Sequence, residues 1–63
     1  MDPQACLARI INTIAEKDYE EAFYACNDMI NWLKKGGTVS TLDLEVPLDF
    51  FQSLRWCLKR MQV

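Results

Sequence analysis

Two helical segments separated by only one or two residues constrain this chain more than any other feature of its sequence. Asp2 and Pro3 supply an N-cap and a proline at the first helical position. A second helical pattern begins directly after Asp18. Helices joined by so short a link must fold back on each other, so we predict an antiparallel αα-hairpin of residues 3–16 and 19–35. The apolar residues of the first segment recur at helical spacing: Leu7, Ile10, Ile11 and Ile14.

The second helix carries start and stop signals at its two ends. Asp18 and Glu21 have the spacing of a capping box, in which Asp18 accepts from the Glu21 amide and the Glu21 side chain reaches back. Gly36 and Gly37 are suited to a left-handed C-terminal cap. The apolar residues between them share one face: Tyr19, Ala22, Phe23, Cys26, Met29, Ile30 and Leu33.

A long connection separates this hairpin from a third predicted helix. Residues 36–46 form the connection, and their second half alternates apolar and acidic residues. This alternation predicts an extended segment that lays Leu42, Leu44 and Val46 across the hairpin, or a short edge strand. Whether the segment is functional or only a connection stays open. Pro47 starts the third helix, about residues 47–62, whose apolar stripe is Phe50, Phe51, Leu54, Cys57, Leu58 and Met61.

The fold class that follows is a small all-α, three-helix domain. Its 63 residues form a single domain, 1–63, and 51% of them are apolar. A chain of this size buries only about 60% of its unfolded surface, so its core is marginal. Small domains of this kind need a disulfide, a metal, dense packing or a partner chain. The simplest partner is another copy, so we expect a homo-oligomer.

The cysteines and the missing histidines limit the chemistry of the chain. Cys6, Cys26 and Cys57 lie on or beside apolar stripes, which predicts buried, reduced thiols, with a disulfide as the alternative. The chain has no histidine, so a zinc site of thiols and imidazoles cannot be completed, and the usual general base near neutral pH is missing. We therefore expect no enzymatic activity, no metal and no cofactor.

Membrane insertion and secretion are not expected either. No apolar run approaches the 18 residues that would span a bilayer. The opening residues Met-Asp-Pro-Gln lack the positive segment of a secretory signal. The expected location is the cytoplasm.

Aromatic residues outside the apolar stripes indicate a surface for a partner. At 100° per residue, Trp56 lies opposite the stripe of its helix, beside Gln52, Lys59 and Arg60. We also assign partner binding to Trp32, at the edge of its stripe, and to Tyr24, which faces outward. The alternative for Trp32 is a wider core contact that the long connection covers.

These features predict a small, non-catalytic protein–protein interaction module that associates with itself. The same surface would suit an inhibitor or adaptor of a larger protein. The alternative is a small nucleic-acid-binding or regulatory protein that uses the basic face around Trp56, although a net charge of −2 disfavours nucleic acid.

Two short segments resemble known proteins. Asp18-Tyr19-Glu20-Glu21-Ala22 is similar to the D-Y-x-x-A turn of a tetratricopeptide repeat, and the resemblance covers residues 10–33. It implies a helix–turn–helix unit and transfers no binding residue. Residues 32–37 resemble the W-L-x-x-G-G helix end of small bacterial and phage proteins, which implies a bacterial or viral source and no known activity.

Overall fold

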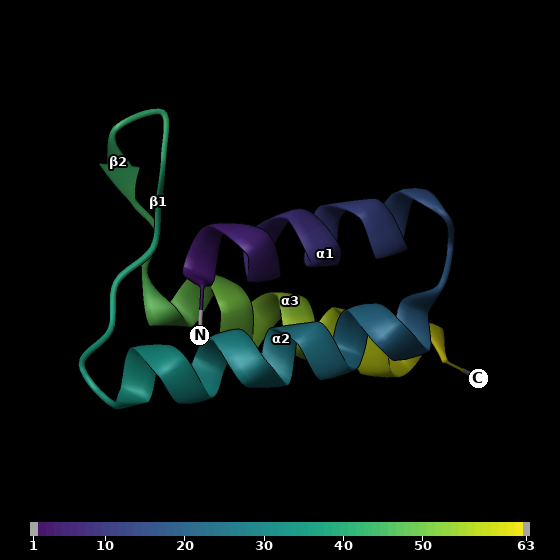
Figure 1. Cartoon of the computed structure of the whole chain (residues 1–63). Coiled ribbons are helices and arrows are strands. Elements are labelled where there is room, and N and C mark those ends of the chain that lie inside the picture. Colours follow the sequence, from purple (N-terminus) through teal and green to yellow (C-terminus); the bar gives the residue numbers. More distant parts are fainter. Residues whose placement is uncertain (1, 63) are drawn as a thin grey trace.

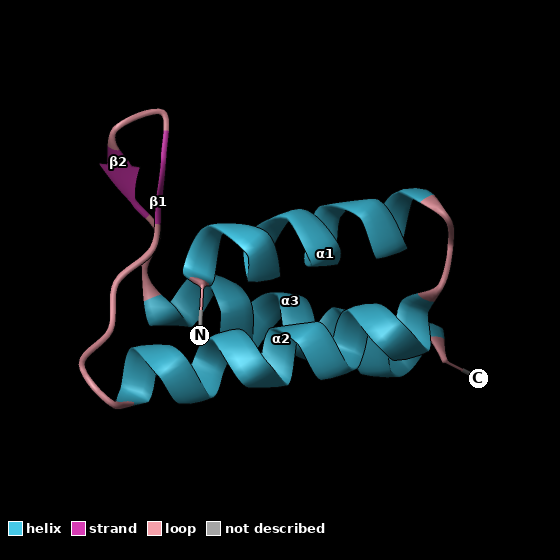
Figure 2. Cartoon of the chain, viewed as in Figure 1, coloured by secondary structure: helices cyan, strands magenta, loops and turns pink. Residues whose placement is uncertain are grey.

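Three helices and a two-stranded hairpin make up the computed structural model, which describes residues 2–62. The elements are α1 (Pro3–Ala15), α2 (Tyr19–Lys34), β1 (Ser40–Thr41), β2 (Leu44–Glu45) and α3 (Leu48–Met61). Figure 2 shows that the helices dominate and that the strands lie in the connection before α3. The all-α fold, with an αα-hairpin and a third helix after an extended connection, is confirmed.

The turn between α1 and α2 is held by backbone hydrogen bonds at both helix ends. Lys17 adopts a left-handed conformation with φ of 61°. The amide of Lys17 donates to the Ile14 carbonyl at 3.0 Å, and the amide of Asp18 donates to the Thr13 carbonyl at 2.8 Å. This pair of bonds is a Schellman motif, closed by a lysine where glycine is the usual residue. The same Asp18 also caps α2, because its carboxylate accepts from the Glu21 amide at 3.2 Å.

The other predicted caps are confirmed with one exception. Asp2 accepts from the amides of Gln4 and Ala5 at the start of α1. Gly36 has φ of 93° and closes α2. The exception is the Glu21 side chain, which does not reach back to Asp18. It pairs instead with Arg9 of α1, which also contacts Asp28 at 3.2 Å. These ion pairs are exposed, so they add little stability.

The helix α2 is the centre of the core. Both α1 and α3 pack against it, whereas α1 and α3 scarcely contact each other. Small side chains on α2, such as Ala22 and Ala25, are fully buried and let its neighbours approach closely. The fully or nearly fully buried core residues come from all three helices and the connection: Cys6, Ile10, Ala22, Ala25, Cys26, Met29, Ile30, Val39, Phe51 and Leu58.

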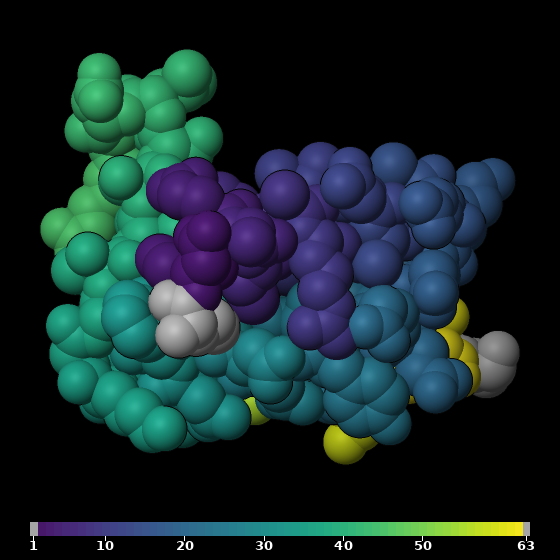
Figure 3. Space-filling view, viewed as in Figure 1, coloured from purple at the N-terminus to yellow at the C-terminus, as the bar shows by residue number. Residues whose placement is uncertain are grey.

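The connection does not cross the helical hairpin as predicted. After Val39, which is buried, the chain turns away and forms the antiparallel pair β1–β2, which projects beyond the helices (Figures 1 and 3). Leu42 and Leu44 are exposed, and only Val46 packs against the core. The alternating pattern thus marked a strand correctly but assigned the wrong leucines to the interior.

Trp32 fixes the first part of the connection to α2. Its indole N–H donates to the Thr38 carbonyl at 3.0 Å. A Cβ on Gly37 would overlap the Trp32 ring, so this glycine is needed for the close approach. Gly36 is different, because a Cβ there would meet open space and only its φ favours glycine.

These two glycines provide a matched test of the Trp32 contact. Gly37→Ala should lower the free energy of unfolding by about 2–3 kcal/mol, because the ring or the backbone must shift. Gly36→Ala should cost only about 1 kcal/mol, the strain of a left-handed alanine. Urea denaturation followed by circular dichroism measures both. A larger loss for Gly36→Ala would show that the Trp32 contact does not hold the connection.

Candidate functional site

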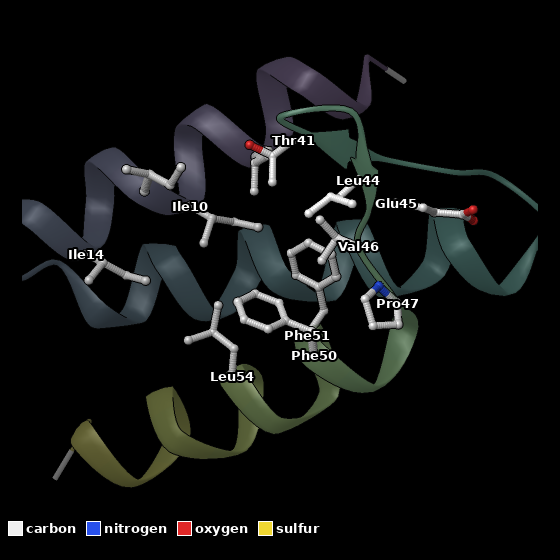
Figure 4. A pocket seen from close by; sticks show the side chains of 12 residues that line it. Ile10, Ile14, Thr41, Leu44, Glu45, Val46, Pro47, Phe50, Phe51 and Leu54 are labelled. Carbon is white, nitrogen blue, oxygen red and sulfur yellow. The ribbon is translucent and has the colours of Figure 1, made fainter.

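An apolar groove runs between α1 and α3, with α2 behind it. Its volume is about 520 Å³. Figure 4 shows that Ile10 and Ile14 enter it from α1, and Phe50, Phe51 and Leu54 from α3. Leu44 and Val46 close one end. The complete lining is Leu7, Ile10, Ile11, Ile14, Thr41, Leu44, Glu45, Val46, Pro47, Phe50, Phe51 and Leu54.

The groove exists because the apolar stripes of α1 and α3 are wider than α2 can cover. On α1, Ile10 is buried against α2, whereas Ile11 is 58% exposed. On α3, Phe51 is buried, whereas its neighbour Phe50 is 52% exposed, with its ring edge-on to Phe51 at 5.2 Å between centroids. Their helical spacing predicted that all of these side chains face the core. The outer edges of both stripes in fact face each other across an open channel.

The β-hairpin at the end of the groove carries an unusual residue. Leu42 is 91% exposed, and Leu42 and Asp43 have φ of 52° and 64°. Two consecutive left-handed residues between paired strands form a type I′ turn, which favours Asn-Gly. A leucine in this conformation costs about 1 kcal/mol relative to glycine. Packing against the rest of residues 2–62 offsets little of that cost at so exposed a position.

The predicted site around Trp56 lies elsewhere on α3. Trp56 follows Leu54 by two residues and is therefore turned about 160° around the helix from the groove. It is 61% exposed, and the Arg60 guanidinium lies over its ring, 4.7 Å from the centroid. Trp56 and Lys59 border one shallow cleft, and Gln52 is partly buried. Trp56 and Arg60 therefore already form a cation–π pair within the chain.

The remaining predicted residues are not gathered into one surface. Tyr24 is half-exposed and packs edge-on against Phe23, 5.7 Å between centroids. Phe23 borders the Trp56 cleft, so Tyr24 is near that face. Trp32 lies eight residues beyond Tyr24 on α2, about 12 Å along the helix axis. Trp32 is only partly buried, and the connection packs on it. This agrees with the alternative prediction for Trp32, a wider core contact that the long connection covers.

Sequence reasoning missed the groove, although its signal was present. Each outer helix has more apolar residues than one contact with α2 needs. Ile11 on α1 and Phe50 on α3 were the surplus that lines the groove, and both are exposed. The width of a stripe, rather than its presence, was the informative quantity.

The three cysteines are free thiols with different environments. Cys6 and Cys26 are buried, and the Cys6 thiol donates to the Ala25 carbonyl at 3.4 Å. Cys57 is exposed, which corrects its assignment to the core stripe. Burial is the main reason that the pKa of Cys6 is raised and that the pKa of Cys26 is raised to about 11.

Within residues 2–62 no cluster of three or more candidate metal ligands is found. In the same part of the chain no helix is both long and apolar enough to cross a membrane. No protein-family model matches the chain, and neither a curated protein nor a solved structure is significantly similar to it. The resemblance to a tetratricopeptide repeat thus stays a prediction.

The buried Cys26 makes the stability of the fold depend on pH. In the unfolded chain a thiol ionises near pH 8.5, whereas burial keeps Cys26 neutral in the folded chain up to about pH 11. Its contribution is complete below pH 8.5 and is lost as the pH rises toward 11. We expect a loss of about 3 kcal/mol across this interval.

Urea denaturation at several pH values measures this loss, and Cys26→Ala is its control. The variant starts from a lower stability because a buried side chain becomes smaller. Its stability should then fall less steeply with pH, since the Cys26 thiol is the one ionisable group in which the two proteins differ. Parallel curves for the two proteins would contradict a neutral buried thiol at Cys26.

Proposed function

We propose that this chain is a small, non-catalytic protein–protein interaction module that associates with itself through the groove between α1 and α3. The observation that supports the proposal is the groove itself. Its lining is almost wholly apolar, and its one charged residue, Glu45, lies at the end formed by the β-hairpin. A surface of this kind binds another apolar surface and offers little to a polar substrate.

The size of the exposed surface agrees with this role. Three lining residues dominate it: Ile11, Leu44 and Phe50. At roughly 200 Å² for a large side chain, their exposed parts amount to on the order of 350 Å². The largest apolar patch on a monomer is about 300–600 Å² and is often functional. A polar rim would extend the patch toward the roughly 800 Å² per partner of a standard interface.

The Trp56 face is the second candidate surface. It would suit a protein partner or, in the alternative function, a base of a single-stranded nucleic acid stacked on the indole. Three cations lie on or beside this face, Arg55, Lys59 and Arg60, and two of them already contact other side chains of the chain. Arg60 stacks on Trp56, and Arg55 donates to the Asn27 side chain at 2.7 Å. We therefore favour the groove over the Trp56 face, and protein over nucleic acid.

The same groove would serve docking on a larger protein, as an inhibitor or adaptor does. An amphipathic helix laid between α1 and α3 would contact both exposed stripe edges at once. Self-association is preferred because it completes the marginal core of a 63-residue chain without a second gene product.

Sedimentation equilibrium from low micromolar concentration upward tests the groove against the Trp56 face. Ile11→Lys places a charge on the half-exposed edge of α1 and should weaken self-association by about 2 kcal/mol, roughly 30-fold. It should leave the helical content unchanged, because exposed substitutions cost the fold little. The matched control is Trp56→Ala, which changes an equally exposed residue on the other side of α3.

The outcomes separate the surfaces clearly. Weakening by Ile11→Lys alone supports the groove. Weakening by Trp56→Ala alone moves the interface to the Trp56 face and refutes the groove. A wild-type chain that stays monomeric at the highest concentration refutes self-association.

A further inference from the structure

Leu42 is the most exposed large apolar side chain among residues 2–62, and its backbone is strained. It lies at the tip of the β-hairpin, which projects beyond the three helices (Figures 1 and 3). Asparagine or glycine would fit the turn better and would be more soluble at this position. In the part of the chain that the structure describes, Leu42 is not among the residues packed against the core, so its strain is not offset there. Backbone strain that no contact offsets supports the hypothesis that Leu42 has a functional role.

Among residues 2–62, no segment covers the groove at the end far from this hairpin. Thr41, Leu44 and Val46 close the near end. Figure 4 shows Ile14 and Leu54 toward the opposite end, where no comparable segment closes the lining. The chain therefore has an unfilled apolar channel with an open end and, separately, an apolar side chain on a projecting arm.

We infer that the occupant of the groove is a second copy of this chain, related by a two-fold axis, whose Leu42 covers the open end beside Ile14 and Leu54. This inference rests on the proposed function and specifies its partner and geometry. When two grooves face each other in antiparallel fashion, the hairpin of each copy reaches the open end of the other. Each copy then contributes the same patch to the interface, as a two-fold interface requires.

The exposed apolar area and the low net charge agree with this arrangement. The exposed groove edges amount to on the order of 350 Å², and Leu42 of the hairpin adds about 200 Å². A polar rim extends this patch toward the roughly 800 Å² per partner of a standard interface. The net charge of −2 per chain adds little repulsion.

The sharpest test is Leu42→Asn, because it separates the fold from the interface. Asparagine suits the left-handed position, so the monomer should unfold at the same temperature as wild type or higher. The substitution removes Leu42 from both copies of the dimer, so the dimer dissociation constant should rise about 100-fold. The control is Asp43→Gly, which relaxes the same turn and keeps Leu42. Its dissociation constant should change less than about threefold.

Sedimentation equilibrium of wild type, Leu42→Asn, Asp43→Gly and Ile11→Lys gives a distinct result for each possibility. A dimer that Leu42→Asn and Ile11→Lys both weaken supports the inference. If Ile11→Lys weakens the dimer and Leu42→Asn does not, the groove is used but Leu42 does not fill it, and only this inference fails. Growth beyond two copies refutes the two-fold arrangement, since such pairing is closed. A monomeric wild type refutes the inference together with the self-association on which it rests.

Discussion

The packing of two helices on one is the constraint on which the rest of this structure depends. Both α1 and α3 pack on α2, and α2 uses buried small residues, Ala22 and Ala25, to accept close neighbours. An α-helix is only about 10 Å across, so it cannot cover the inner faces of both partners completely. The uncovered edges of α1 and α3 line the groove, and the β-hairpin closes one end of it. The core and the candidate site therefore have one cause, which is that a single helix packs against two others.

Much of the fold could be predicted because its determinants are local. The caps at Asp2 and Asp18 and the left-handed Gly36 act within a few residues, and the helices end within one residue of their predicted limits. The turn at Lys17 was not visible, because lysine carries no left-handed signal. The ion pair between Glu21 and Arg9 could not be predicted either, because Arg9 lies on another helix.

The site was harder to predict because exposure depends on how far a neighbour reaches. Trp56 was recognised as exposed from its angle on α3 alone, and it is. Phe50 and Cys57 lie on the apolar side of the same helix, and helical periodicity cannot show that α2 packs against only the other edge of that stripe. For Leu42, the alternation of residues predicted a strand but not the turn that reverses it. The groove depends on three elements together, so no single segment of sequence contained it.

Asp18 has a further consequence for how the chain folds. It belongs to the last hydrogen bonds of α1 and the first of α2, through its amide and its carboxylate respectively. We therefore expect fraying at the end of α1 to weaken the start of α2. Contacts across so short a turn close little chain, so they form at small entropic cost and quickly. The first two helices thus act as one cooperative unit, and α3 must find a surface that already exists.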